Sequence, residues 1–339
     1  EYIEITKDNQ IKKNKYYYFN DFDIKSLNID YRNKKNVINY FEELLTDSIK
    51  LRCNTNLPIA MTLSGGTDST LIYTLIKEKL GNNITAFTYS NQNEKKDEYN
   101  LVEKLVKKYN DKVIKLEYDN EKFKEDYENA LIALNAPCCI SDAGYYSVYK
   151  RIKEKNFKVL LEGHGADEIL GGYPTYFIPA IKQAILENKL LLALNILNIH
   201  KLNRTVNITP KEIQSILKCL FRIEKTNPKI YSQCIHYLTT KYPLPKYLRY
   251  FDRLTMANSI ESRNPFLDYR IVEFARALPL EYKVNRIGNK AILREILKKY
   301  KIDFIHENKI KRGFTTSEEI AIKNNKDFLL KYYNQKRFN

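Results

Sequence analysis

Residues 57–70 read LPIAMTLSGGTDST, an apolar run that leads directly into a loop with two adjacent glycines. The run from Leu57 to Leu63 has the length and character of a buried strand, and residues 67–80 have the pattern of a helix. A strand that passes through a glycine-rich turn into a helix is typical of α/β proteins, which bind nucleotides at the carboxyl ends of parallel strands. The segment therefore predicts a parallel sheet with a ligand site at residues 64–69.

The first half of the chain continues this alternation of strands and helices. Further buried strands are predicted at residues 84–89, 113–116 and 159–161, and helices at residues 37–51, 97–109 and 142–154. From about residue 176 onward the pattern is nearly all helical, and residues 1–35 are polar and irregular. The prediction is an α/β fold, a doubly wound parallel sheet that carries a helical C-terminal half.

Composition narrows the class of protein. Of 339 residues, 43% are hydrophobic and 29% are charged, as in a globular protein, and the most apolar stretch, residues 190–199, is too short to span a membrane. The net charge is +16, but the lysines are spread among Glu and Asp, so nucleic-acid binding is less favoured than a basic cleft for a triphosphate. The five cysteines lack metal-ligand spacing, which favours free thiols in a reducing cytoplasm. Since the chain opens with Glu1 and shows no leader pattern, we expect a piece of a longer product without a signal peptide.

The loop LSGGTDST at residues 63–70 has the composition of a phosphate site. Its two glycines let the backbone approach a phosphate closely, and the N–H groups at the start of the following helix attract negative charge. Asp68 would repel a bare phosphate, so its expected role is to hold a Mg²⁺ ion that bridges the phosphates. No lysine follows the glycines, so the loop is not a GxxxxGK[ST] P-loop. The alternative is a strand-to-helix turn without a ligand.

A second loop, LEGHGADEILGGY at residues 161–173, follows another predicted strand. We expect it to form a second wall of the same nucleotide site, where Asp167 shares the metal with Asp68. The alternative is a glycine-rich loop whose acidic pair, Asp167 and Glu168, is solvated.

Two further stretches lie in the predicted helical half. Residues 252–268 contain four charged residues that by themselves would suit a buried ion-pair network before a proline-bounded turn: Asp252, Arg253, Glu261 and Arg263. Residues 288–294 read GNKAILR and place Lys290 at a predicted helix start, where a lone lysine is usually solvated.

Together these stretches resemble a known family. Residues 64–69 resemble the SGGxDS loop of ATP pyrophosphatases, which release pyrophosphate and leave AMP on their substrate. Residues 163–173 resemble the GEGADELFGGY segment of asparagine synthetases, and residues 252–268 resemble their DRxSMAxSxExRxPFLD segment. Residues 288–294 resemble the family's GxxKxxLR, with one residue fewer between Gly and Lys, and residues 311–314 resemble its closing KxGF. The motifs keep their order from about residue 57 to residue 314 and so resemble the synthetase domain of that family.

The resemblance implies an adenine nucleotide alpha-hydrolase-like fold, ATP and Mg²⁺ as cofactors, and roles for particular residues. Four are implied in catalysis: Lys290, His164, Asp68 and Asp167. Two of these, Asp68 and Asp167, are implied as metal ligands. The implied ATP-binding residues are Leu63, Ser64, Gly65, Gly66, Asp68, Ser69, Tyr89, Glu162 and Gly163. Residues implied in substrate binding are Glu168, Glu261, Arg263 and Asp268.

In this family an N-terminal glutaminase domain supplies ammonia through an internal tunnel, and nothing in this chain matches that domain. Residues 14–21 (NKYYYFND) resemble the stretch where such a domain gives way to the synthetase. We therefore expect residues 1–35 to be a linker remnant from an upstream glutaminase domain and residues 36–339 to form the synthetase domain. A carboxylate and ammonia or an amine are the implied substrates, and a homodimer stays open.

Two positions depart from the asparagine synthetase pattern. His164 stands where the family has a Glu linked to the aspartyl-adenylate and where β-lactam synthetases have a Tyr, and Glu162 stands where the family usually has Ser. A His can act as a base near neutral pH, which an amine nucleophile would need more than ammonia would; the alternative is a spacer that only hydrogen-bonds the loop.

Three function classes remain: asparagine synthesis from aspartate, an amide ligase for another carboxylate (a peptide, a uronic acid or a β-lactam-type precursor), and a tRNA-modifying ATP pyrophosphatase. Only the first two explain residues 163–173 and 261–268. A non-catalytic scaffold would predict loss of Asp68, Asp167 or Lys290, and all three are present.

Overall fold

The computed structural model describes residues 1–16, 29–90, 99–117, 119–173, 176–202, 230–302, 304 and 318–334. Its centre is a five-stranded sheet in the order β5-β4-β3-β6-β7, in which every neighbouring pair is parallel. The strands are β3 (Ile59–Thr62), β4 (Ile84–Ser90), β5 (Val113–Glu117), β6 (Val159–Leu161) and β7 (Glu261–Arg263). The predicted doubly wound α/β fold is confirmed, and the order of the strands reverses between β3 and β6. In such sheets the crevice outside the strand ends at this reversal is the usual place for a ligand.

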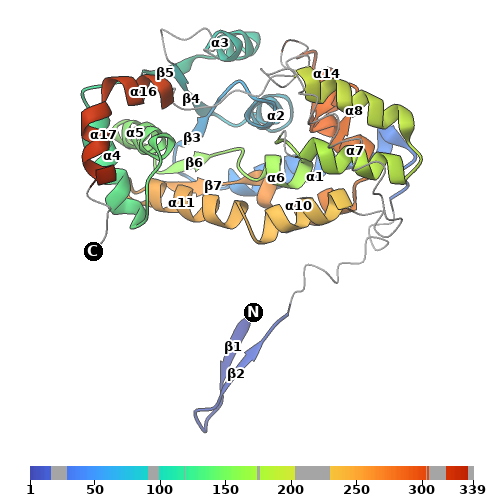
Figure 1. The fold of residues 1–339 in the computed structure, drawn as a ribbon, viewed down its shortest axis with the longest axis horizontal. Coiled ribbons are helices and arrows are strands. Elements are labelled where there is room, and N and C mark those ends of the chain that lie inside the picture. The colour runs from blue at the N-terminus through green and yellow to red at the C-terminus, as the bar shows by residue number, and fades with distance from the viewer. Residues whose placement is uncertain are drawn as a thin grey trace.

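Helices cover both faces of the sheet, and Figure 1 shows its strands between α4 and α5 on the left and α2 on the right. Successive strand residues point to opposite faces, so Met61 joins one apolar core while Ala60 joins the other. The helices around the sheet are α1 (Lys34–Arg52), α2 (Thr67–Leu75), α3 (Tyr99–Lys108), α4 (Phe123–Leu134), α5 (Ile140–Glu154), α11 (Leu244–Met256), α12 (Tyr269–Ala277) and α14 (Ala291–Lys299). A π-helical turn, Ile76–Leu80, extends α2. The sheet is therefore the middle of three layers.

The remaining helical elements are α6 (Ala166–Leu170), α7 (Phe177–Leu186), α8 (Leu190–Leu202), α10 (Ile230–Thr240), a 3₁₀ turn (Pro265–Leu267), α13 (Leu280–Lys283), α16 (Glu318–Asn324) and α17 (Lys326–Asn334). A third apolar cluster, which includes Phe177 and Tyr231, holds α7, α8, α10 and α13 together. None of the helices in the described parts of the chain combines the length and apolar character that a membrane crossing requires.

The second half is mostly helical, as predicted, but the described residues also contain strands at two places that the sequence pattern did not predict. Residues 261–263 form β7, the fifth strand of the sheet, and β8 (Val284–Asn285) pairs with β9 (Gly288–Asn289) in a short antiparallel ladder. β7 reads Glu-Ser-Arg and has no apolar run, so periodicity could not reveal it; pairing with β6 makes it a strand.

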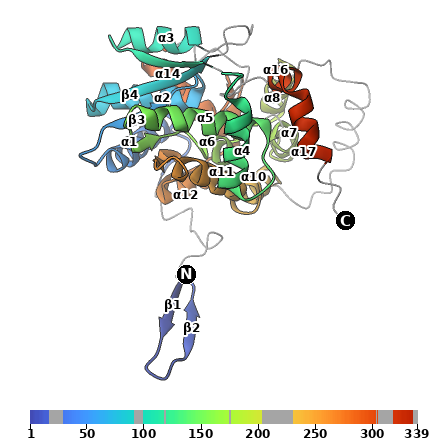
Figure 2. The same ribbon diagram turned by 90° about the vertical axis from the view of Figure 1, so that its left-hand side faces the viewer.

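The N-terminal segment also differs from the expected irregular structure. β1 (Tyr2–Ile5) and β2 (Ile11–Asn14) form an antiparallel hairpin in which Tyr2 pairs with Asn14. The turn uses Asn9 at a φ of 58°, a conformation that Asn tolerates better than most residues. Figure 2 shows this hairpin apart from the sheet and its helices.

Candidate active site

Three side chains that the sequence suggested lie in direct contact at the strand reversal. Asp68 is in the first turn of α2, directly after β3, and Asp167 is in the first turn of α6, directly after β6. Lys290 Nζ lies 2.5 Å from Asp68 Oδ2 and 2.7 Å from Asp167 Oδ1. The lysine is only 5% exposed, so it is not the solvated residue that a helix start usually carries. One ammonium thus bridges two carboxylates from neighbouring strand ends.

Glycines allow the walls of the site to close on these side chains. A Cβ at Gly172 would lie 1.8 Å from Asp167 Oδ1 and 2.3 Å from Lys290 Cε, distances that no real side chain tolerates. A Cβ at Gly163 would lie 3.1 Å from the Cβ of Asp68. The glycines of the second loop are therefore needed for close approach, which the sequence alone could not distinguish from turn formation.

A buried guanidinium supports the backbone under Lys290. Arg294 is 4% exposed and donates from Nε to Asn289 O at 2.8 Å and from Nη2 to Asn289 Oδ1 at 3.1 Å. Asn289 Nδ2 in turn donates to Gly172 O at 2.5 Å. Lys290 itself has a φ of 50°, in the left-handed region. These contacts fix an unfavourable backbone conformation and link the turn before α14 to the loop that closes on Asp167.

The charge state of Lys290 follows from two opposing effects. Burial lowers the pKa of its amine, but the nearby carboxylates of Asp167 and Asp68 outweigh burial and raise the pKa. The lysine is therefore an ammonium at neutral pH.

The loop after β3 has the form of an anion site. Gly65 has a φ of 70°, a left-handed conformation that suits glycine, and Gly66 is the N-cap of α2. Ser64 Oγ and Ser69 Oγ lie 3.0 Å apart, and Ser64 Oγ also accepts from the N–H of Gly66 at 3.2 Å. Hydroxyls and N–H groups therefore gather at the positive end of a helix, next to Asp68.

Glu162 and His164 form a second charged pair at the end of β6. Glu162 is 1% exposed; its Oε2 accepts from Ser262 Oγ at 2.7 Å, and its Oε1 accepts from the Tyr149 hydroxyl at 3.0 Å. His164 Nε2 lies 3.4 Å from Glu162 Oε1. The imidazole stacks on Phe251, with ring centroids 3.8 Å apart. Glu162 and His164, the two residues that depart from the family pattern, therefore contact each other. The sequence did not predict this contact.

The pKa shifts of this pair show that each stabilises the charge of the other. Burial opposes charge on His164, but the carboxylate of Glu162 outweighs it and raises the pKa of the imidazole. Burial also raises the pKa of Glu162, yet His164, Ser262 and Tyr149 together lower it below its usual value. The imidazolium therefore persists to a higher pH than in an isolated histidine, and the carboxylate persists to a lower pH than in an isolated glutamate.

A cavity of about 670 Å³ lies beside this pair. Phe251 and Ser262, which contact His164 and Glu162 respectively, both line it. The pair therefore has a neighbouring space on the side of α11 and β7.

The four residues implied in substrate binding have structural partners. The Tyr173 hydroxyl donates to Glu168 at 2.7 Å, and burial raises the pKa of Glu168. Arg263 Nε donates to the exposed Glu261 at 2.8 Å. Asp268 caps α12 and accepts from Arg270 Nη2 at 2.9 Å. Glu261 and Arg263 form an ion pair, but Glu261 is exposed, so the pair is not the buried network of the alternative. A substrate role for the four residues stays a prediction.

Two of the residues implied in ATP binding, Tyr89 and Leu63, are buried. Tyr89 is 7% exposed and belongs to an apolar core, and Leu63 is fully buried and donates its N–H to Phe87 O. Their contact with ATP stays a prediction. The KxGF resemblance at residues 311–314 lies outside the described residues. Cys53 and Cys234 are free thiols, as predicted.

The donor set at Asp68 and Asp167 fits the predicted Mg²⁺. Within the described ranges no group of three or more His, Cys, Asp or Glu side chains could hold a metal. Mg²⁺ is typically held by one or two protein carboxylates together with substrate phosphates and water, so two carboxylates beside an anion loop suit it.

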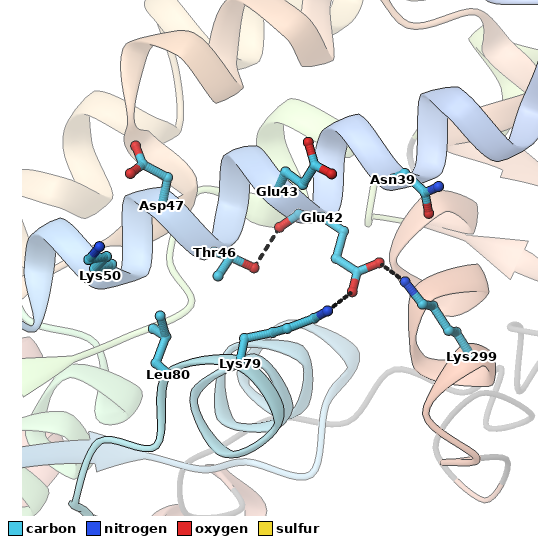
Figure 3. A pocket seen from close by; sticks show the side chains of 9 residues that line it. All are labelled: Asn39, Glu42, Glu43, Thr46, Asp47, Lys50, Lys79, Leu80 and Lys299. Atoms are coloured by element: carbon cyan, nitrogen blue, oxygen red, sulfur yellow. Dashed lines mark hydrogen bonds and ion pairs between the residues drawn. The ribbon is translucent and has the colours of Figure 1, made fainter.

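A separate hollow of about 470 Å³ lies between α1, the π-helical turn and α14 (Figure 3). Glu42 is 3% exposed there, and its Oε2 lies 2.7 Å from Lys299 Nζ while its Oε1 lies 3.9 Å from Lys79 Nζ. Because this carboxylate is already ion-paired, we assign the hollow to the packing of α1 against its neighbours.

The family model for asparagine synthase matches residues 40–338. The chain belongs to the asparagine synthase family. It is similar to asparagine synthetase [glutamine-hydrolyzing] 2 of Bacillus subtilis (strain 168), with 27% identity over 274 residues, which cover 77% of this chain and 36% of that protein. It is also similar to asparagine synthetase [glutamine-hydrolyzing] 3 of the same organism, with 25% identity over 75% of this chain and 44% of that protein.

A third relative of this asparagine synthase family member is the amidase chyE of Penicillium rubens, with 22% identity over 89% of this chain and 56% of that protein. The chain thus spans less than half the length of the two Bacillus relatives. Among solved structures, a U34-tRNA thiolase from Methanococcus maripaludis matches 68% of this chain and 82% of that chain with 17% identity. Its TM-score of 0.31 is too low to bear on the fold.

Proposed function

We propose that this chain forms an amide bond in two ATP-dependent steps. A carboxylate oxygen attacks the α-phosphorus of ATP. The bond from the α-phosphorus to the oxygen that bridges it to the β-phosphorus breaks, and pyrophosphate leaves. A nitrogen nucleophile then attacks the acyl carbon, the bond to AMP breaks, and the nitrogen loses a proton. The observation that carries the proposal is the contact of Lys290 with both Asp68 and Asp167 at the strand reversal.

In the first step the protein handles negative charge. The N–H groups and hydroxyls of residues 64–69 would bind the phosphates at the start of α2. Mg²⁺ held by Asp68 and Asp167 would neutralise the phosphates when bound. Charge grows on the leaving pyrophosphate in the transition state, and the Lys290 ammonium is positioned to stabilise it there.

In the second step His164 would take the proton from the nitrogen nucleophile. Its contact with Glu162 orients the imidazole and, by raising its pKa, makes the neutral form a stronger base. The cavity beside Phe251 and Ser262 would give the nucleophile access to this pair.

Aspartate with glutamine-derived ammonia is the substrate pair that we favour, and we place the enzyme in the cytoplasm. Two relatives are named as glutamine-hydrolysing, and this chain spans 36% and 44% of their lengths, which supports an upstream glutaminase half in a longer protein. We accordingly assign residues 1–35 to the linker and residues 36–339 to the synthetase domain.

An amide ligase for a different carboxylate is the second candidate. The pairing of His164 with Glu162 favours it, because a base is needed more by an amine than by ammonia. One relative is named as an amidase and not as an asparagine synthetase.

The test is nucleotide product analysis with a panel of carboxylates and with ammonia or amines as nitrogen donors. We expect AMP and pyrophosphate in equal amounts, dependent on one carboxylate class, with the amide identified by mass spectrometry. Release of ADP and phosphate would exclude an acyl-adenylate. A product from aspartate and ammonia would select asparagine synthesis over the second candidate.

A further inference from the structure

In this structure the cation between the two predicted metal ligands is a lysine ammonium. Lys290 Nζ is within 2.7 Å of a carboxylate oxygen of each aspartate. The three side chains are mostly buried, with exposed fractions of 7% for Lys290, 17% for Asp68 and 18% for Asp167. The ammonium therefore satisfies much of the negative charge that would otherwise attract a metal ion.

The surroundings leave little room for a second cation beside it. The backbone of Gly172 packs directly against Asp167 Oδ1 and Lys290 Cε, and Gly163 packs against Asp68. A divalent ion at these carboxylates would also lie close to the ammonium, and like charges repel strongly in a partly buried site.

We propose that Lys290 and the metal ion compete for Asp68 and Asp167, so that free metal cannot occupy the site until a triphosphate draws Lys290 away. The inference rests on the proposed function, and it adds an order: the metal enters with the nucleotide and not before it.

The parts needed for this exchange are present. The backbone at Lys290 is held by Arg294 and Asn289, whereas the lysine side chain is a flexible four-carbon stem. A triphosphate on the loop at residues 64–69 would lie next to Asp68, because α2 begins within that loop. Its negative charge would attract the ammonium, and both carboxylates would be released to the metal.

The test measures binding of Mn²⁺ alone, by electron paramagnetic resonance of the free ion, to the whole chain without nucleotide. Lys290→Met is expected to bind one Mn²⁺ at least about tenfold more tightly than the unaltered chain, since the competing charge is gone. Lys283→Met is the matched control, because Lys283 is also buried (1% exposed) but has no ion pair to a described residue. It should bind Mn²⁺ as weakly as the unaltered chain.

Thermal unfolding gives a second readout that tolerates a weakened fold. Mn²⁺ alone should raise the Tm of Lys290→Met but not that of the unaltered chain or of the double variant Asp68→Asn, Lys290→Met. Equal Mn²⁺ affinity of the unaltered chain and Lys290→Met would overturn the competition. If the unaltered chain then still binds Mn²⁺ together with ATP, the metal site of the proposed function survives; if it does not, that site fails as well.

Discussion

The imidazole of His164 lies flat against the ring of Phe251, with ring centroids 3.8 Å apart and an interplanar angle of 12°. His164 follows β6 in the sheet, and Phe251 lies on α11, so the contact fixes the loop of one against the helix of the other. The same imidazole faces the buried carboxylate of Glu162. Phe251 therefore holds the predicted base in place. Because Phe251 has no reactive group of its own, its effect on activity must pass through His164.

Phe251→Leu should slow nitrogen transfer and leave adenylation nearly unchanged. Aromatic pairs of this kind contribute about 0.5–1.5 kcal/mol, so amide formation should fall roughly twofold to tenfold as the imidazole loses its orientation. Carboxylate-dependent exchange of pyrophosphate into ATP reports the first step, and amide yield reports both steps. Tyr237→Leu, at an exposed aromatic of α10, is the control. Equal losses in both assays would show that Phe251 supports the fold and not His164.

The rate of amide formation should rise with pH through a pKa above the usual 6.5 of histidine, because Glu162 raises the pKa of His164. Glu162→Gln should move this rise in rate to lower pH. Burial lowers the pKa of His164, and in this variant the Glu162 carboxylate no longer opposes it. The linked stability has the same sign: the contribution of His164 is full below pH 6.5 and is lost as the pH rises through its folded pKa. Amide formation measured from pH 5.5 to 9 tests the shift. A pH dependence that is the same in Glu162→Gln and in the unaltered chain would exclude His164 as the base.

Asp68→Asn and Asp167→Asn should each abolish pyrophosphate release, because each removes a predicted metal ligand. Loss of metal stabilisation amounts to several kcal/mol, which corresponds to a rate decrease of more than about 100-fold. Both variants should keep the fold, since an amide has nearly the same shape as a carboxylate. Pyrophosphate release at limiting Mg²⁺ is the measurement, with circular dichroism as the folding control. Near-normal release by either variant would remove that residue from the ligand set.

Lys290→Ala should lower turnover far more than it weakens ATP binding, because the charge that Lys290 would stabilise grows mainly in the transition state. Lys290→Arg should restore little activity, since a planar guanidinium does not replace a compact point charge beside the leaving pyrophosphate. Pyrophosphate release and ATP affinity are measured on the same preparations. A silent variant, or equal losses in binding and turnover, would argue against this role.

Gly172→Ala should inactivate the enzyme, because the new Cβ would fall 1.8 Å from Asp167 Oδ1 and would displace this predicted metal ligand. Gly81→Ala is the contrasting variant, because no atom lies within 4 Å of its Cβ, although its φ of 64° should cost about 1 kcal/mol of stability. We expect Gly81→Ala to retain turnover at a lower Tm. Retained turnover in Gly172→Ala would mean that the close packing of the loop on Asp167 is not needed.

The sequence predicted most of the sheet because its strands β3, β4 and β6 are apolar runs between helical segments. It missed β7, whose three residues are polar and are held by β6 alone. The nearness of Asp68 and Asp167 also followed from sequence, since adjacent parallel strands end at one edge.

The contacts of the site were less predictable. The burial of Lys290 required knowledge of how the helical half packs against the sheet, and its motif by itself suited a solvated position. The partners of Glu162 come from α5 and β7, so no local spacing could reveal them. Arg294 belongs to the GxxKxxLR resemblance, but its hydrogen bond to Asn289 O could not be predicted. That bond depends on the left-handed backbone at Lys290, which sequence does not encode locally.

The order of the three site residues along the chain has a consequence for how the site forms during translation. Asp68, Asp167 and Lys290 come from early, middle and late parts of the chain, and the lysine is the last to be synthesised. A nascent chain that ends before Lys290, the residue that precedes α14, can pair β3 with β6 but has no ammonium to place between the two carboxylates. Translation must therefore pass residue 290 before the assembled site can exist, and fragments cut short of that point would hold two adjacent acids without their lysine.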